Sequence, residues 1–195
     1  MIVLIPWMVA VTPPFFPTSS FGSLFYGLML ACCLALVLTD LKSQRLPNRL
    51  TVSMLLLGIV MNLVRAIWLG VNEEPGRYFG MTGIFGGLLE GFAFSLAGFV
   101  VAFIIFSVLW QLQKCGAGDV KMMAALGAWI GPFWFLFVFA GTIVAVLVIM
   151  IVWWLVAYVM KRNPGLKISY ALPASISVAV LMLWFWRATW WQIIY

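Results

Sequence analysis

Residues 116–132 read GAGDVKMMAALGAWIGP, and this stretch decides how the rest of the chain is interpreted. An acidic residue, Asp119, follows two glycines, and the apolar segment after Lys121 is interrupted at Gly131 and Pro132. Proline lacks the backbone N–H that a helix needs, so a helix is expected to end or bend there. The segment is shorter than the ~20 residues that cross a hydrocarbon core. It therefore predicts a short membrane segment that does not cross the bilayer alone, or that crosses where the protein is locally thin.

The composition around this stretch is that of an integral membrane protein. The chain has 195 residues, of which 66% are hydrophobic and 8% charged, whereas an ordinary soluble domain has about 25% charged residues. Its mean hydropathy is +1.15. We therefore expect an all-α integral membrane protein with about six spans. The predicted spans are about Phe21–Thr39, Leu50–Leu69, Ile84–Trp110, Val120–Gly131, Phe133–Met160 and Ile168–Trp186.

The expected domain organisation is a single six-span unit with short extensions. Residues 21–188 form the membrane domain in this interpretation, and residues 189–195 form a short tail. Met1–Val11 is apolar but has no basic start and no A-x-A-like cleavage site, so it does not resemble a signal peptide. Because eleven residues are too few to span, residues 1–20 are expected to form an interfacial extension anchored by Trp7, rather than an imperfect span.

The basic residues set the expected orientation. Three segments, 40–49, 111–121 and 161–167, hold eight of the eleven Lys and Arg residues. These are Lys42, Arg45, Arg49, Lys114, Lys121, Lys161, Arg162 and Lys167. By the positive-inside rule these segments are cytoplasmic and the N-terminus lies outside. Because basic loops are the topological default in the cytoplasm, they give no indication of a nucleic-acid partner.

Several chemistries are excluded by residues that the chain lacks. It has no histidine, which excludes a His-based zinc site and a serine triad. Its three cysteines, Cys32, Cys33 and Cys115, form no C-x-x-C motif. We expect no metal and no cofactor.

The first motif is DLKSQRLPNRLT, residues 40–51, where the first span meets a basic segment. Pro47 stops the preceding conformation, and Asn48 is a suitable N-cap for the next span. A span end, a basic turn and a capped restart would explain most of the motif. They would not explain why an acid, Asp40, stands at a boundary otherwise supplied with Lys and Arg.

The second motif is GAGDVK, residues 116–121. Gly116 and Gly118 allow positive φ angles and the close approach of another chain. Asp119 then opens a helix, where the dipole favours a carboxylate. A helix cap after a glycine loop would explain this motif equally well. Lys121 either lowers the pKa of a nearby carboxyl group or only contributes to topology.

The two motifs indicate more together than either does alone. Between Asp40 and Asp119 the chain leaves through one span and returns through the next, so both aspartates belong at the cytoplasmic boundary. Ionisable groups at membrane depth are functional candidates by default. Two carboxyl groups at short range share a proton. The ionised one can then activate water while the protonated one polarises a carbonyl.

These residues resemble a known family. Asp40 followed by Leu46-Pro47-Asn48 and Thr51, then residues 116–121 continuing into Met122–Gly131, resemble the type IV prepilin peptidases, which are G-x-G-D aspartic proteases. The resemblance extends from about residue 34 to the C-terminus and includes Lys167–Pro173. At the entry to the last span, Ser169 stands where the family commonly has proline.

The resemblance implies a function and a site. Asp40 and Asp119 would be the catalytic pair, and Gly116 and Gly118 would shape the loop that holds Asp119. The substrate would be a prepilin or pseudopilin precursor, cut on the cytoplasmic side of the inner membrane to release a short basic leader, usually after glycine. Longer members also methylate the new N-terminus and carry an added cytoplasmic domain, often with paired C-x-x-C motifs. Because this chain has no room for that domain between its spans, it resembles the compact peptidase-only form of tight-adherence pili.

Other interpretations stay open. The archaeal preflagellin branch shares G-x-G-D, whereas the presenilin-like branch is disfavoured because no Tyr-Asp motif is present. Paired acids also occur in proton-coupled transporters and channels, and a catalytically silent pilus assembly factor would have the same sequence pattern. The sequence predicts no oligomeric state.

The remaining charges and aromatics inside the spans are expected to be structural. Arg65 and Glu90 lie toward the outer side, where they are expected to pair or to reach the interface. The eleven tryptophans are expected to anchor the protein at bilayer interfaces and on lipid-facing surfaces.

Overall fold

Four long helices and one shorter helix make up the part of the chain that the structure describes. In the computed structural model this part comprises residues 19–43, 46–72, 83–160 and 172–180. The long helices are α2 (Ser19–Ser43), α3 (Asn48–Val71), α4 (Gly83–Gln111) and α5 (Ala117–Val159), and residues 172–180 are also helical. Each long helix has the length and apolar composition needed to cross a membrane. The prediction of an all-α membrane protein with several spans is confirmed.

The helix bounds agree with most of the predicted spans. The first three predicted spans correspond to α2, α3 and α4, each of which extends a few residues further at one or both ends. The last predicted span is described only over residues 172–180, where it is helical. The expectations for residues 1–18 and for the tail from residue 189 lie outside the described residues.

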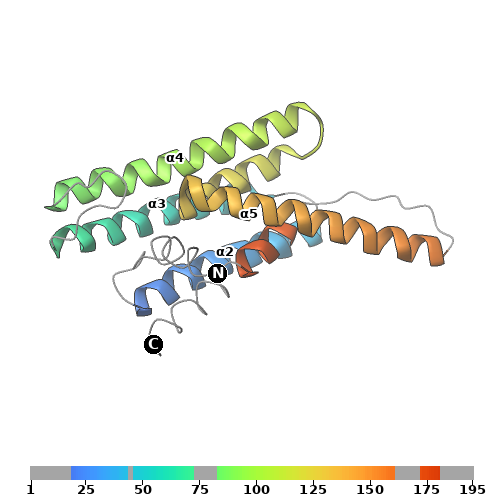
Figure 1. Ribbon diagram of the computed structural model, residues 1–195, viewed down its shortest axis with the longest axis horizontal. Helices are drawn as coiled ribbons and strands as arrows, with labels where there is room; N and C mark the ends of the chain where they lie inside the picture. Colours follow the sequence, from blue (N-terminus) through green and yellow to red (C-terminus); the bar gives the residue numbers. More distant parts are fainter. Residues whose placement is uncertain (1–18, 44–45, 73–82, 161–171, 181–195) are drawn as a thin grey trace, which may run out of the picture.

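The helix α5 is broken about a third of the way along its length. As a straight helix its 43 residues would extend about 65 Å, twice the ~30 Å hydrocarbon core. Gly131 instead has φ 75° and ψ 174°, a conformation open essentially to glycine alone, and Pro132 follows it. Figure 1 shows the chain reversing direction there, so that a first leg (residues 117–130) is followed by a second leg (residues 132–159) that returns past it. The predicted end of the short segment is confirmed.

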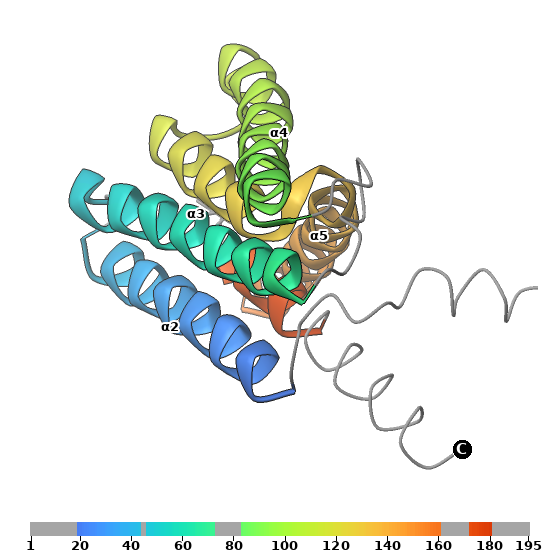
Figure 2. The ribbon, with the colours of Figure 1, turned by 90° about the vertical axis from the view of Figure 1, so that its left-hand side faces the viewer.

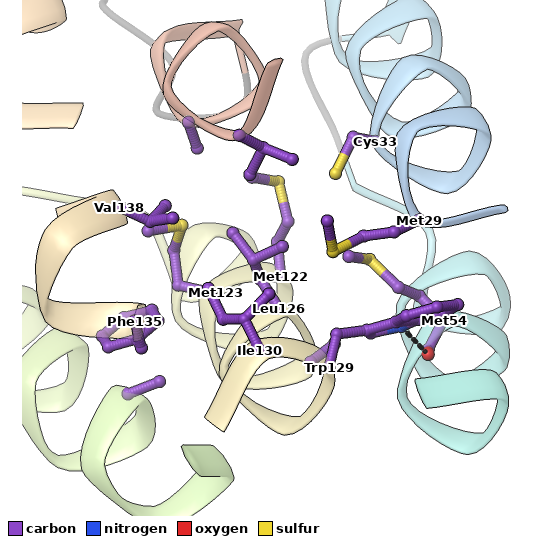
Figure 3. Close-up of a cluster of buried hydrophobic side chains, with 14 of the residues drawn as sticks. Met29, Cys33, Met54, Met122, Met123, Leu126, Trp129, Ile130, Phe135 and Val138 are labelled. Atoms are coloured by element: carbon purple, nitrogen blue, oxygen red, sulfur yellow. Dashed lines mark hydrogen bonds between the residues drawn. The ribbon is translucent and has the colours of Figure 1, made fainter. Parts of the chain in front are cut away.

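The first leg is the most enclosed segment among the residues that the structure describes. Every residue from Met122 to Gly131 is buried, as expected for a helix that is hydrophobic on all sides. Figure 3 shows its side chains meeting α2 through Met29 and Cys33, and the second leg through Phe135 and Val138. The hydrophobic core of the described residues therefore surrounds this leg.

The helix α4 packs against both legs of α5. The backbones of Gly98 and Gly127 touch, since a Cβ on either glycine would overlap the other residue's carbonyl oxygen. Further along α4, the Phe106 ring meets the rings of Phe135 and Phe139 edge-on, at centroid distances of 6.4 and 5.6 Å. Small residues that let backbones approach closely are typical of helix contacts in membranes.

The described tryptophans include several exposed side chains and one that is completely buried. Trp68, Trp110, Trp153 and Trp154 are about half exposed, as expected for side chains that face lipid or its interface. Trp129 is completely buried, so its interpretation as a membrane anchor is wrong. The amphipathic indole permits both roles, and here its N–H group bonds to a carbonyl inside the protein, as described below.

Candidate active site

The G-x-G-D motif builds the start of α5. Gly116 precedes the helix in an extended conformation, with φ −84° and ψ 157°. Its carbonyl oxygen accepts hydrogen bonds from the backbone N–H groups of Asp119 and Val120, at 3.1 and 3.3 Å. The Gly116 N–H in turn donates to Oδ2 of Asp119 at 2.9 Å. The half-buried carboxylate thus caps its own helix at the end where the dipole favours negative charge.

Gly116 and Gly118 do not have the positive φ angles that glycine was expected to allow in this motif. Among the described residues, positive φ angles at glycine occur at Gly83 and Gly131, not in this motif. Gly118 lies inside the first turn of α5 rather than in a loop. Close approach by another segment, the second expected use of glycine, does occur: a Cβ at Gly118 would lie 3.1 Å from Cβ of Leu46. A larger side chain at Gly118 would therefore push against Leu46.

Asp40 lies in the last turn of α2. It is half-buried, and the helix ends three residues later at Ser43. The neighbouring Thr39 hydroxyl donates to the carbonyl oxygens of Ala35 and Leu36, at 3.0 and 2.9 Å. The polar end of α2 therefore begins at the turn that carries Asp40.

The Leu-Pro-Asn segment connects this region to the start of α5. Leu46 contacts Gly118, and the Lys121 ammonium donates to Oδ1 of Asn48 at 2.9 Å. Asn48 was expected to be the N-cap of α3, and this is wrong: Pro47 holds that position, and its side chain makes no capping hydrogen bond. The N–H groups of Leu50 and Thr51 bond to the Pro47 carbonyl, while the Asn48 side chain turns to Lys121.

The two aspartate-bearing helix ends lie at the same end of the bundle. Figures 1 and 2 show the end of α2, the start of α3, the end of α4 and the start of α5 together. We call this the aspartate end. Lys42, Arg49, Lys114 and Lys121 are exposed there. The catalytic roles of the two aspartates stay a prediction.

The charge of Asp119 also affects a nearby thiol. Cys115 lies in the turn before α5, half-buried, with Sγ 3.6 Å from the Phe106 carbonyl oxygen. Partial burial raises the pKa of the Cys115 thiol, and the Asp119 carboxylate raises it further. The reactivity of the Cys115 thiol is therefore expected to depend on the charge of Asp119. No three His, Cys, Asp or Glu side chains gather into a possible metal site within the described ranges.

Arg65 and Glu90 lie away from the aspartate end. Arg65 follows Asn48 by 17 positions, or about 26 Å along α3. Both charged residues are buried, on the adjacent helices α3 and α4. The Arg65 guanidinium lies over the Phe94 ring, 4.7 Å from its centroid, a cation–π contact. The ion pair between Arg65 and Glu90 stays a prediction.

One polar residue inside the bundle was missed at the sequence level. Asn62 is completely buried in α3 and bonds across to the end of the first leg of α5. The available signal was an uncharged amide inside an apolar span. Such a residue indicates a hydrogen-bonding partner, but its position alone does not identify that partner.

Fold and site together define a class: a multi-pass helical membrane protein that gathers two aspartates from separate helices at one end. A family model narrows this class. Residues 27–151 match the type IV leader peptidase family, and the chain belongs to that family. The matched region begins within α2, ends within the second leg of α5, and includes Asp40 and Asp119.

Individual relatives agree with the family. The prepilin leader peptidase/N-methyltransferase of Pectobacterium carotovorum subsp. carotovorum is 30% identical over 115 residues, covering 56% of this chain and 35% of the relative. The protein of that name from Escherichia coli (strain K12) is 30% identical over 121 residues, covering 60% of this chain and 44% of the relative. The protein of that name from Aeromonas salmonicida is 31% identical over 117 residues, covering 58% of this chain and 34% of the relative. The chain thus matches less than half the length of each relative, and no solved structure matches it.

Proposed function

We propose that this chain is a membrane-embedded aspartic endopeptidase that removes the short basic leader from type IV prepilin-like precursors. The observation that carries the proposal is the contact between the two motifs. Leu46 packs on Gly118 and Asn48 accepts from Lys121, so the segment that follows Asp40 is held against the turn that carries Asp119. Family membership supplies the substrate class.

The proposed chemistry needs only the two carboxyl groups and water. One aspartate is ionised and takes a proton from the attacking water, whose oxygen adds to the scissile carbonyl carbon. The other is protonated and donates to the carbonyl oxygen, which stabilises the tetrahedral intermediate. The C–N bond then breaks as the leaving nitrogen takes the proton that the first aspartate removed from water, and the second aspartate takes back its proton from the intermediate's hydroxyl group. The products are a leader with a new carboxyl group and a pilin with a new amino group.

The finer assignments also belong to this proposal. We place the aspartate end in the cytoplasm and the N-terminus outside, because the basic residues gather at that end. The enzyme is of the peptidase-only form, without N-methyltransferase activity, as in tight-adherence pilus systems. A proton-coupled transporter and a silent assembly factor are the competing functions.

Co-expression with a candidate prepilin tests the proposal, with processing followed by a mobility shift and N-terminal sequencing of the product. Asp40→Asn and Asp119→Asn should each abolish processing while the protein still accumulates in the membrane. Lys42→Gln is the matched control, because Lys42 is exposed two residues from Asp40, and this variant should process normally. Full leader removal by either aspartate variant would exclude the dyad, whereas an inactive wild type would favour the competing functions.

A further inference from the structure

The break in α5 leaves backbone carbonyl groups without hydrogen-bond donors from their own helix. A helix end leaves carbonyl groups without intrahelical donors, and in hydrocarbon such groups must be satisfied by protein. Pro132 has no N–H to offer the Ala128 carbonyl four residues earlier. The turn at Gly131 likewise diverts the chain before Phe133 can continue the helix toward Trp129. The first leg therefore ends with carbonyl oxygens that need donors from elsewhere.

Asn62 of α3 supplies the missing donors. Its Nδ2 lies 2.9 Å from the Ala128 carbonyl oxygen and 3.0 Å from that of Trp129. It also lies 3.2 Å from the Gly58 carbonyl oxygen within its own helix. All three neighbours are acceptors, so the NH₂ group rather than the amide oxygen must face them. The side chain is completely buried, which removes competition from water.

A second contact holds the same end of the leg. The indole Nε1 of Trp129 donates to the Met54 carbonyl oxygen at 2.7 Å, the dashed line in Figure 3. The absence of a side chain at Gly58 makes room for this ring, since a Cβ there would lie 2.5 Å from it. The end of the first leg is therefore fixed to α3 at two heights, through Asn62 and through Met54.

The end of the first leg at Trp129 is joined to the aspartate end by continuous helix. Asp119 precedes Trp129 by ten residues, or about 15 Å of helix, and no break interrupts that stretch. Axial slippage or rotation at Trp129 therefore moves the Asp119 carboxylate by a comparable amount. We propose that Asn62 is a positioning residue, which fixes the register and rotation of the first leg and so sets Asp119 relative to Asp40. This inference rests on the proposed peptidase function.

The kinetic test compares Asn62→Leu, which keeps the side-chain size but removes the donor, with the wild type. We expect kcat for precursor cleavage to fall at least tenfold with KM changed less than threefold, because ångström-scale misplacement of a catalytic group costs about 10²-fold. Thr142→Val is the matched control: Thr142 is buried, and its hydroxyl donates within its own helix, to the Val138 carbonyl oxygen. This variant should keep the wild-type kcat. Asn62→Gln, which restores an amide donor, should recover part of the loss.

A second measurement reads the position of the leg without using activity. Leu46 and Gly118 lie close enough for a cysteine pair at these positions to cross-link. In a background with Cys115→Ser, we expect oxidation to bridge the pair rapidly with Asn62 present and several-fold more slowly with Asn62→Leu. If the wild type cleaves no prepilin, the proposed function fails. The cross-linking rate still decides whether Asn62 holds the first leg in position.

The outcomes separate cleanly. Slower cross-linking together with reduced kcat supports the proposal. Equal cross-linking in both backgrounds overturns it even if cleavage falls, and unchanged kcat overturns the positioning role even if cross-linking slows. Should Asn62→Leu fail to accumulate, Gly58→Ala displaces the same end by pressing on Trp129 and is judged by the same two measurements.

Discussion

Replacing Gly131 by alanine should destabilise the protein strongly, because both the backbone and the surroundings at this position exclude a side chain. Its φ of 75° and ψ of 174° fall in a region that costs other residues about 1–3 kcal/mol. A Cβ would also overlap three atoms of the Phe94 ring, and overpacking of this kind costs about 1–3 kcal/mol. The sum predicts a loss of about 2–6 kcal/mol in the free energy of unfolding.

The measurement is reversible unfolding of the purified protein in mixed micelles of mild detergent and dodecyl sulfate, followed by circular dichroism. Gly27→Ala is the matched control, because a Cβ at Gly27, inside α2, would meet nothing within 4 Å. This control should gain about 0.5–1 kcal/mol from better helix propensity. A double-mutant cycle with Phe94→Leu separates the two contributions, since only the overlap with the ring is relieved.

The reasoning is refuted if Gly131→Ala unfolds within about 0.5 kcal/mol of the wild type, the range of an ordinary surface substitution. That result would mean that the helix can bend without the glycine conformation. An effect removed entirely by Phe94→Leu would instead show that only the ring contact matters.

Three further predictions concern the aspartate end. Asp119→Asn should lower the raised pKa of the Cys115 thiol because it removes a negative charge, so maleimide should label Cys115 faster at a fixed, mildly alkaline pH. The labelling is done with alanine at both cysteines of α2, and an unchanged rate would contradict the influence of Asp119 on the thiol. Gly118→Val should slow prepilin processing by pushing on Leu46, and Leu46→Ala in the same chain should restore part of it; equal rates in the single and double variants would argue against the contact. Lys121→Met should change stability by less than about 1 kcal/mol, since its bond is exposed, but should reduce processing; a fully active variant would mean that the bond to Asn48 is dispensable.

The sequence predicted the helices well because lipid imposes simple rules. A membrane segment must be apolar over a set length and must bond its own backbone, so α2, α3 and α4 were visible in the hydropathy pattern. The end of the first leg was equally visible, since Gly131-Pro132 disrupts a helix in any environment. Membership of the leader peptidase family followed from two short motifs whose spacing and residue types are unusual in an oily chain.

What could not be predicted depends on contacts between distant segments. Asn48 is a good N-cap by residue type, but the approach of Lys121 offers its side chain a charged donor instead. Trp129 has the character of an interfacial anchor, but its place in the central leg buries it. Gly118 was expected in a loop, and its close approach to Leu46 is used inside a helix. In each case the residue type allowed several roles, and the partner that selects one lies more than 70 positions away.

The bond from Asn62 to the broken helix also has a consequence for how the protein is made. The carbonyls that satisfy Asn62 belong to residues synthesised 66 and 67 positions later. At about 5–20 residues per second, Asn62 is therefore synthesised roughly 3–13 s before these carbonyls. Until then its amide can bond within α3, to the Gly58 carbonyl oxygen. The two bonds that hold the first leg therefore form only after α5 has been inserted.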